Sequence, residues 1–254
     1  MSFPETPTFC LGGKQALVTG GSKGIGFAAA VALAKAGARV WIAARSRQVL
    51  TEAVNVAAAH DVLLHALELD ITDDAQVARV IEELPPLDIL VNSAGMARHA
   101  PFSEASMADY DAVMAVNVRA TFYLSQQVVR RMQAAGLPGA IIHVSSQMGH
   151  VGGKNRSVYC ASKFALEGLT RAMAIELGPH NIRVNTLCPT FIDTALSRQS
   201  LADPDFYQYV MRQIALGRAG ELEDIMGPVV FLASPAAAMI TGTSLLVDGG
   251  WTAS

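Results

Sequence analysis

The sequence is poor in charged residues, which make up only 16% of its 254 positions, whereas 51% are hydrophobic. Lysine and arginine are scattered and the formal net charge is −3, so the basic patch needed to bind a phosphate backbone is missing. No apolar run approaches the roughly 18 residues of a membrane span, and no basic residue precedes Lys14, as an export signal would require. We therefore expect a soluble, unexported protein with neither a nucleic-acid nor a membrane partner.

Cysteine is also scarce, with only Cys10, Cys160 and Cys188. Their odd number and irregular spacing predict neither disulfides nor a metal site, and free thiols are typical of a reducing compartment, here the cytoplasm. The six histidines lack the spacing of metal-binding motifs such as H-E-x-x-H. The sequence therefore predicts no bound metal.

Short apolar runs rich in valine, isoleucine and leucine alternate with longer segments of helical periodicity, which is the pattern of βαβ units. Several runs are apolar almost throughout, like strands buried on both faces of a parallel sheet. The sequence thus predicts an α/β fold, a doubly wound parallel sheet of Rossmann type with seven strands, right-handed crossovers and helices on both faces. The predicted strands are 15–19, 39–44, 63–69, 88–92, 140–145, 182–188 and 244–248, and the predicted helices are 26–37, 74–84, about 107–135 and 157–177.

The length suits one α/β domain, so we expect residues 1–254 to form a single dinucleotide-binding and catalytic domain with an N-terminal tail at 1–12. One later region, 190–220, shows little periodicity and carries Phe206, Tyr207 and Tyr209. Irregular excursions of this kind inside a compact fold often form lids. We expect the segment at about 193–217 to close over a substrate.

The first βα turn, "VTGGSKGIG", places Gly20, Gly24 and Gly26 between a predicted strand and a predicted helix. Glycines there let the chain turn tightly and let a pyrophosphate approach the N–H groups of the helix N-terminus. The spacing G-x-x-x-G-x-G differs from the common G-x-G-x-x-G pattern, and a merely structural turn is the alternative. A second small turn, "NSAG" at 92–95, follows the fourth predicted strand, at the sheet edge where open α/β folds bind ligands. The alternative is that it is an ordinary turn at the end of a strand.

Tyr159 and Lys163 are one helical turn apart, and Ser146 follows the fifth predicted strand. An ammonium group on the same helix face favours the phenolate, so we expect the pKa of Tyr159 to be lowered from about 10 toward neutrality. Such a phenol can protonate the alkoxide that develops when hydride is delivered to a ketone, and Ser146 can hold the same oxygen. The alternative is that Tyr159 and Lys163 merely share a solvated helix face.

In these motifs the sequence resembles the short-chain dehydrogenase/reductase family over nearly the whole chain, from about Leu11 to "VDGG" at 247–250. The resemblance implies that Tyr159 is the acid/base and that Lys163 lowers its pKa and binds the nicotinamide ribose. It also implies that Ser146 orients the carbonyl and that Asn117 holds a water in a proton relay. The implied cofactor-binding residues are Gly20, Ser22, Lys23, Gly24, Ile25, Gly26, Arg45, Asp70, Ile71, Asn92, Ala94, Gly95, Tyr159, Lys163, Pro189, Ile192 and Thr194.

Two positions depart from the family pattern. Ser93 stands where a second asparagine is usual, and Thr190 stands where glycine usually follows proline beside the nicotinamide. The candidates for lining the substrate pocket are chosen by position alone, and packing in the core or in a turn is the alternative for each of them. They are Met96, Gln147, His150, Asn155 and Phe191.

The end of the second predicted strand bears on the choice of cofactor. NAD-preferring sites commonly place a carboxylate there to accept hydrogen bonds from ribose hydroxyls, but Ala44 occupies the position at which the family's NAD users carry aspartate. Arg45 follows it and Lys23 lies in the glycine turn, and both can grip a 2′-phosphate unless they are ordinary solvated side chains. The sequence therefore predicts NADP(H), with NAD less favoured.

Together these features predict an NADP-dependent oxidoreductase that interconverts a secondary alcohol and a ketone of carbonyl, sugar or polyol type. One rival is a 3-oxoacyl-[acyl-carrier-protein] reductase, for which Arg98, Lys154 and Arg156 would supply a basic docking patch. The other is a non-catalytic dinucleotide sensor, which would not need the serine, tyrosine, lysine and asparagine set.

A homotetramer is expected chiefly from the resemblance. The long predicted helices carry apolar residues beyond one face, and a monomer would leave these residues partly exposed to water. Examples are Val128, Val129, Phe164, Leu166 and Leu169.

Overall fold

The computed structural model describes residues 3–253, apart from the side chains of Leu196 and Gln199. Its centre is a seven-stranded parallel sheet in the order β3-β2-β1-β4-β5-β6-β7, so the predicted doubly wound architecture is confirmed. Every predicted strand is present, with ends within one residue of the prediction. The strands are β1 Gln15–Thr19, β2 Arg39–Ala44, β3 Leu64–Glu68, β4 Ile89–Asn92, β5 Gly139–Val144, β6 Ile182–Pro189 and β7 Ser244–Val247.

The helices that connect the strands include two that the sequence did not reveal, α2 and α9. The expected helix at about 107–135 consists of α4, a π-helical turn at Ala115–Ala120, and α5. No helix within residues 3–253 combines the length and the apolar character needed to cross a membrane. The α-helices are α1 Gly24–Lys35, α2 Arg47–Ala58, α3 Asp74–Glu83, α4 Met107–Met114, α5 Thr121–Ala134, α6 Ser157–Leu177, α7 Ala195–Leu201, α8 Pro204–Gln213 and α9 Leu222–Ala233.

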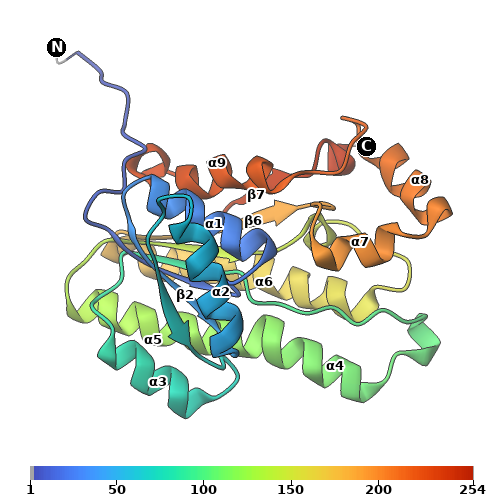
Figure 1. Cartoon of the computed structure of the whole chain (residues 1–254), viewed down its shortest axis with the longest axis horizontal. Helices are drawn as coiled ribbons and strands as arrows, with labels where there is room; N and C mark the ends of the chain where they lie inside the picture. The colour runs from blue at the N-terminus through green and yellow to red at the C-terminus, as the bar shows by residue number, and fades with distance from the viewer. Residues whose placement is uncertain (1–2, 254) are drawn as a thin grey trace.

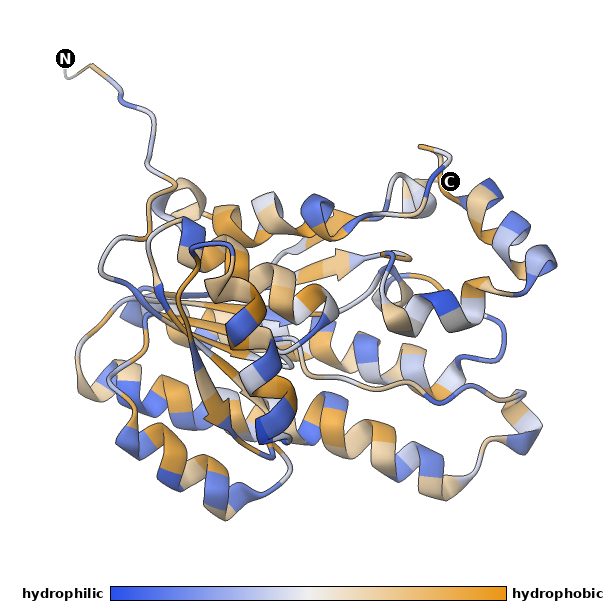
Figure 2. Cartoon of the chain, in the orientation of Figure 1, coloured by the Kyte–Doolittle hydropathy of each residue, from blue (hydrophilic) through white to orange (hydrophobic). Residues whose placement is uncertain are grey.

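Alternate side chains of each strand face opposite sides of the sheet, and this alternation builds two hydrophobic cores. On one side Ala16 and Val18 of β1 pack with α1, α2 and α9, and on the other Leu17 packs with α3, α5 and α6. In Figure 1, α1 and α9 lie above the sheet and α3, α4 and α5 lie below it. Hydrophobic residues follow the central strands, and hydrophilic residues mark the outer turns of the helices (Figure 2).

All seven strands run in the same direction, so their carboxyl ends meet at one edge of the sheet. β1 pairs with both β2 and β4, with Thr19 opposite Asn92 in the second pair. The winding direction therefore reverses between β1 and β4, and open α/β sheets bind ligands in the crevice above such a switch point. The glycine turn after β1, the 92–95 turn after β4 and Ser146 after β5 all lie at this edge.

The expectation of an irregular segment at 193–217 is wrong in part, because α7 and α8 occupy most of it. Thr194 caps α7 in a reciprocal capping box, and Asp203 caps α8 by accepting from two main-chain N–H groups. Short polar caps of this kind start helices that are too brief to show clear periodicity.

Aromatic side chains tie α8 to the rest of the molecule. The ring of Phe191 lies 5.7 Å from that of Phe206 and 5.8 Å from that of Trp251, and Tyr209 lies 6.2 Å from both Phe206 and Trp251. Rings at these separations attract one another beyond the area that they bury. The helix α8 therefore packs over the exit of β6 and beside the C-terminal residues.

The long helices expose fewer of the predicted apolar residues than expected. Val128, Val129 and Leu166 are buried in or beside the sheet-facing cores, so the expectation that a monomer leaves them partly exposed is wrong. Their helix faces turn inward because α5 and α6 cover the same side of the sheet. Phe164 is half-exposed, as expected, and further exposed apolar side chains stand on α4, α5 and α6, namely Met107, Tyr110, Phe122 and Ile175.

Candidate active site

The glycine turn is held tightly against the 92–95 turn. Gly20 has a φ of +63°, and a Cβ atom there would lie 2.9 Å from the Cα atom of Ala94, so only glycine fits. The hydroxyl of Thr19 accepts hydrogen bonds from the main-chain N–H groups of Ser93 and Ala94, both at 3.1 Å. A Cβ atom at Gly26 would overlap the carbonyl oxygen of Gly20. The three glycines therefore form a cradle at the N-terminus of α1, as the sequence predicts for a pyrophosphate site.

Other predicted cofactor-binding residues converge on this cradle. A Cβ atom at Gly24 would lie 3.5 Å from the methyl group of Thr194, and one at Gly95 would lie 4.0 Å from the Nζ atom of Lys163. Ile71, Pro189 and Ile192 are buried beside the same sheet edge, whereas Ser22 and Ile25 are half-buried in the glycine turn. These predicted residues thus lie along the carboxyl edge of the sheet between the glycine turn and Lys163.

Asn92 is an exception within that set, because its side chain turns into the core. Its Nδ2 atom lies 3.0 Å from Ser125 Oγ and 3.1 Å from His143 Nδ1, and the residue is buried. These contacts join β4 to α5 and β5. Any contact of Asn92 with a cofactor would therefore come from its main chain.

Lys163 is buried on α6 and points back to the sheet edge. Its Nζ atom donates a hydrogen bond of 2.8 Å to the carbonyl oxygen of Val144 and lies 5.5 Å from the centre of the Tyr159 ring. Burial lowers the pKa of Lys163 to about 8, because the protein interior disfavours its charged form. The ammonium is therefore held at the meeting point of β5, α6 and the 92–95 turn.

The pKa of Tyr159 moves in the direction opposite to the one expected. Burial raises it, and the neighbouring Ser146 hydroxyl and the charge of Arg156 oppose this rise without cancelling it. The expected lowering is wrong for this structure because loss of water from around a phenolate outweighs nearby charges. Tyr159 therefore carries its proton at neutral pH, which is the state of a proton donor.

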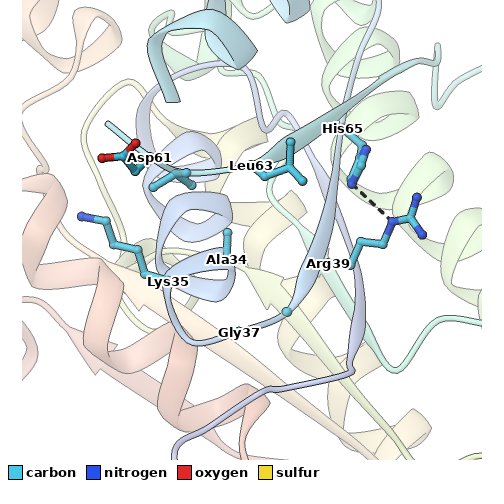
Figure 3. A pocket seen from close by; sticks show the side chains of 9 residues that line it. Ala34, Lys35, Gly37, Arg39, Asp61, Leu63 and His65 are labelled. Atoms are coloured by element: carbon cyan, nitrogen blue, oxygen red, sulfur yellow. Dashed lines mark hydrogen bonds between the residues drawn. The ribbon is translucent and has the colours of Figure 1, made fainter. Parts of the chain in front are cut away.

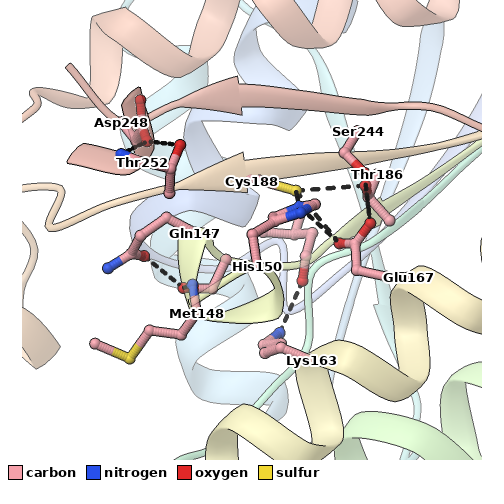
Figure 4. A network of polar contacts seen from close by, with 12 residues as sticks. Gln147, Met148, His150, Lys163, Glu167, Thr186, Cys188, Ser244, Asp248 and Thr252 are labelled. Atoms are coloured by element: carbon pink, nitrogen blue, oxygen red, sulfur yellow. Dashed lines mark hydrogen bonds and ion pairs between the residues drawn. The ribbon is translucent and has the colours of Figure 1, made fainter. Parts of the chain in front are cut away.

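Ser146 and Gln147 are fixed together at the end of β5. The Ser146 hydroxyl donates to Gln147 Oε1 at 2.7 Å and accepts from the main-chain N–H of Met148 at 3.1 Å (Figure 4). Both residues are buried, and the hydrogen bond to Met148 N caps a short 3₁₀ turn. The predicted substrate candidate Gln147 thus contacts the predicted catalytic serine.

Asn117 lies in the π-helical turn between α4 and α5. Its Oδ1 atom accepts from the main-chain N–H of Met96, and its Nδ2 atom donates to the Met96 carbonyl, both at 2.9 Å, and to Ser162 Oγ at 3.1 Å. A π-helical turn re-aims side chains and is frequent at functional sites. Here it directs Asn117 to fasten the loop after β4 onto α6.

A family model described as enoyl-(acyl carrier protein) reductase matches residues 20–252. The D-erythrulose reductase of Gallus gallus is 41% identical over 248 residues, which span 98% of this chain and 99% of that protein. The chain belongs to the short-chain dehydrogenase/reductase family. It is therefore an oxidoreductase, as its sequence predicts.

Two further members of the short-chain dehydrogenase/reductase family have names that bear on substrates. The gluconate 5-dehydrogenase of Gluconobacter oxydans is 36% identical over 258 residues and spans the full length of both chains. The gluconate 5-dehydrogenase of Burkholderia cenocepacia, solved in complex with NADP and tartrate, is 32% identical, with a TM-score of 0.92 over 97% of this chain and 98% of that chain.

The end of β2 is where the sequence predicts a preference for NADP(H). Ala44 ends the strand, and the exposed Arg45 and Lys23 form no ion pair within the described part of the chain. The carboxylate of Asp70 accepts from the main chain and the hydroxyl of Thr72, which lower its pKa, and Arg45 lowers it further. Asp70 is thus engaged locally, and both cations are available to a ligand.

The residues predicted to line the substrate pocket differ in their contacts and in their exposure. Phe191 stacks on Trp251, and Met96 is fastened by Asn117, whereas Asn155 is exposed, with a φ of +62°, and accepts from the main-chain N–H of Ala100. Thr190, at the other departure from the family pattern, has no positive φ, so its side chain fits the backbone without strain. Its main-chain N–H donates to Val247.

His150, the remaining substrate candidate, belongs to a polar network beneath the site. Its Nε2 atom, Glu167 and Cys188 Sγ lie within 4.8 Å of one another, a cluster that the sequence missed because the three residues are far apart in the chain (Figure 4). Burial, and then the charge of Glu167, raise the pKa of Cys188 to about 12, whereas a metal site needs a thiolate. The thiol instead donates to Glu167. The absence of a bound metal stays a prediction, which this protonation state supports.

Sequence reasoning also missed a role for His99 and Arg156 beside Tyr159. The ring of His99 meets that of Tyr159 edge-on at 6.3 Å, and Arg156 contacts His99 through its Nη1 atom. The guanidinium carbon of Arg156 lies 5.6 Å from the ring centre of Phe191 and 5.5 Å from that of Phe206. The only signal in the sequence was that Arg156 lies three residues before the tyrosine.

A surface hollow of about 510 Å³ lies away from these residues (Figure 3). Arg39 and His65, which line it, stand at the amino-terminal halves of β2 and β3, opposite the carboxyl edge that carries the glycine turn. The hollow is open, and its Arg39 is hydrogen-bonded to His65. The hollow therefore lies at the end of the sheet opposite the predicted site residues.

Proposed function

We propose that this chain is an NADPH-dependent reductase that interconverts a secondary alcohol and a ketone of sugar or polyol type. The observation that carries the proposal is the convergence of Ser146, Tyr159 and Lys163 with the glycine cradle at one edge of the sheet. The D-erythrulose reductase and the gluconate 5-dehydrogenase to which the chain is similar support the substrate class.

The residues fit a dinucleotide phosphate. The glycine cradle leaves room for a pyrophosphate that any Cβ atom would fill, and Arg45 and Lys23 offer unpaired charge for a 2′-phosphate. A bound NADPH supplies the hydride, or NADP⁺ accepts it in the reverse direction. Lys163 would bind the nicotinamide ribose, since its ammonium lies beside Gly95.

In the proposed reduction Tyr159 donates its proton to the carbonyl oxygen as that oxygen gains negative charge. The raised pKa of Tyr159 keeps this proton in place until the oxygen becomes basic. Ser146 would release its hydrogen bond to Gln147 and donate its one hydroxyl proton to the same oxygen, and the charge of Lys163 nearby would stabilise the phenolate that remains. In the reverse direction the phenolate accepts the proton of the alcohol.

Asn117 acts mainly as a positioning residue in this proposal. Its side-chain amide is engaged with Met96 and Ser162. The relay water that the family resemblance implies would therefore be held by the main chain of the π-helical turn, where the helical hydrogen bonds are displaced.

The acyl-carrier-protein reductase has less support from the site. Arg98 is engaged with Asp109 at 3.6 Å, and Arg156 lies against two aromatic rings. Of the three residues expected to form a basic docking patch, only Lys154 remains without such a contact among the described residues, and one charge gives a weak docking surface.

The assembly and location are also part of the proposal. We propose a homotetramer, since exposed apolar side chains stand on α4, α5 and α6. A cytoplasmic location is supported by three free cysteines, two of them buried as thiols.

Replacement of Tyr159 by phenylalanine tests the proposed function. We expect Tyr159→Phe to lower kcat for D-erythrulose with NADPH at least about 100-fold, because the change removes only the proton donor. NADPH affinity, measured by fluorescence titration, should change less than about threefold. The exposed Tyr110→Phe on α4 is the matched control. A Tyr159→Phe enzyme with near-normal turnover would refute the assignment.

A further inference from the structure

Arg156 stands beside the proposed reacting phenol and is held there by three rings. Its guanidinium lies near the faces of Phe191 and Phe206, and its Nη1 atom contacts His99, which in turn meets Tyr159 edge-on. Aromatic faces fix the plane of a guanidinium and leave its N–H groups directed outward from the rings. The position of the cation is therefore defined by the protein.

The charge of Arg156 has no partner of opposite sign within the described part of the chain. It is half-buried, and burial lowers its pKa. Other arginines that form part of the fold are matched with carboxylates or carbonyl oxygens: Arg119 with Asp74, Arg198 with Asp193, Arg218 with Asp224, and Arg183 with the carbonyls of Ser234 and Ile240. A half-buried cation costs free energy unless something pairs with it, so an unmatched one indicates a ligand charge.

The groups around Arg156 do not supply that charge. Partial burial, and then Arg156 itself, lower the pKa of His99 to about 4, so His99 is neutral near pH 7. Burial raises the pKa of both Tyr159 and Cys160, so these groups are neutral too. Glu167 is engaged with Thr186 and Ser244. The wall beside the phenol is therefore positive at neutral pH.

We infer that Arg156 binds a carboxylate of the substrate, so that the preferred substrate is a sugar acid rather than a neutral ketose or polyol. This inference rests on the proposed function and names the substrate class of the same site. The planar fork of arginine matches a carboxylate with two parallel hydrogen bonds. The tartrate complex of the Burkholderia cenocepacia relative shows that a hydroxylated dicarboxylate binds that protein, in accord with this substrate class.

The proposed carboxylate site also involves α8, because the guanidinium of Arg156 lies over the ring of Phe206. A carboxylate bound to Arg156 would neutralise the charge at the point where α8 meets the site. The substrate carboxylate would thus sit between the reacting carbon and the helix that covers it. Neutral polyols of the same length would lack this anchor.

The test compares gluconate with gluconamide, its neutral amide, in oxidation with NADP⁺. We expect the wild-type protein to favour gluconate by about 30-fold in kcat/KM, and Arg156→Met to remove most of this preference, as loss of a half-buried charge pair does. Arg156→Lys should give an intermediate preference, because it keeps the charge without the fork. Arg98→Met, which removes a surface charge paired with Asp109, should keep the wild-type preference.

Tartrate binding gives a readout that needs no turnover. Calorimetric titration of tartrate into the protein saturated with NADP⁺ should show binding that weakens at least about tenfold in Arg156→Met and falls with added salt. Threitol, the neutral counterpart, should bind without this salt dependence. Thermal unfolding would report whether Arg156→Met is folded. If it is not, the salt dependence of tartrate binding to the wild-type protein, compared with threitol, still tests for an anion site.

The outcomes separate the two proposals. Equal wild-type use of gluconate and gluconamide, or equal loss of both in Arg156→Met, overturns the carboxylate assignment and makes Arg156 a packing residue. A wild-type protein that oxidises neither compound and reduces no ketose overturns the proposed function, and the tartrate titration then decides the anion site alone. Tartrate affinity that is the same in wild type and Arg156→Met also overturns the assignment.

Discussion

At the scale of the residue, the choice between NADPH and NADH depends on two side chains at the end of β2. Ala44 has no side-chain acceptor for ribose hydroxyls, and the next residue, Arg45, is exposed and forms no ion pair among the described residues. We predict that the protein prefers NADPH and that Arg45→Asp lowers the NADPH-to-NADH ratio of kcat/KM by about 10–100-fold. Steady-state kinetics with both nucleotides would measure it.

The control for this prediction is Arg47→Ala, which removes another exposed arginine two positions further, in the first turn of α2. Its nucleotide preference should stay close to that of the wild type, because the residue points from the helix rather than from the strand end. A wild-type protein that uses NADH as well as NADPH would contradict the prediction.

The sequence located the candidate catalytic residues but not their ionisation. Tyr159 and Lys163 were found because helical periodicity places them on one face, and Ser146 because it follows a strand. The pKa of Tyr159 was given the wrong direction, since spacing shows which charge is near and not how much water is lost. Burial, which decides the sign, arises only when α6 packs against the sheet edge.

At the scale of the element, the proposal that a segment covers the substrate site falls on α7 and α8. Ring contacts join Phe206 and Tyr209 of α8 to Phe191 and Trp251, and Val210 packs in the same cluster, whereas Phe206 also contacts Arg156. We predict that NADP⁺ together with tartrate slows amide exchange in 195–213 at least about tenfold, because the closed position gains contacts. Hydrogen–deuterium exchange would measure this.

The internal reference for this exchange experiment is β1, whose amides lie in the centre of the sheet and should not respond to the ligands. Equal protection of 195–213 with and without ligands would argue that these helices are a fixed part of the fold. A response to NADP⁺ alone would assign the cover to the cofactor rather than the substrate.

The helix α6 is joined to β6 and β7 by one buried carboxylate. Glu167 Oε2 accepts from Thr186 at 2.9 Å and from Ser244 at 2.6 Å (Figure 4). We predict that Glu167→Gln lowers the free energy of unfolding by about 1–3 kcal/mol at pH 7, because an amide offers a single neutral acceptor. Urea denaturation would measure the difference, with the exposed Glu176→Gln on the same helix as the control.

This difference should depend on pH with a definite sign. Burial alone would raise the pKa of Glu167, but hydroxyl hydrogen bonds outweigh it and hold the pKa below its usual range. The folded state therefore binds the proton less tightly than the unfolded state, so the carboxylate stabilises the protein above about pH 4.3. Its contribution is lost as the pH falls through the lowered value. A difference that grew on acidification would contradict this account.

The sequence predicted strands more completely than helices. Each strand is a compact apolar run, but α2 shows its buried face only as Leu50, Ala53 and Ala57, and alanine contrasts little with its neighbours. The helix α9 contains Pro228 and is apolar on most sides, which hides its periodicity. Both helices are nonetheless required, because parallel strands need a crossover connection.

At the scale of the whole molecule, the parallel sheet explains why so few sequence motifs define a site. Strands that run the same way deliver the residues after β1, β4, β5 and β6 to one edge whatever their separation in the chain. The contacts that the sequence could not show are those between different segments that meet at that edge, such as Arg156 with Phe206 and His150 with Cys188. Those contacts depend on helix placement and not on strand order.

We predict a homotetramer because the outer faces of α4, α5 and α6 expose apolar side chains. Phe122 and Phe164 are each 50% exposed and Ile175 is 80% exposed, although the inward residues of the same helices are buried. Apolar surface of this kind usually marks an interface, so light scattering should give about four times the chain mass of 26.8 kDa. Phe164→Glu should shift the protein toward smaller species, whereas Val56→Glu, on the exposed face of α2, should not. A wild-type particle of one chain mass would refute the assembly and leave these side chains exposed to water.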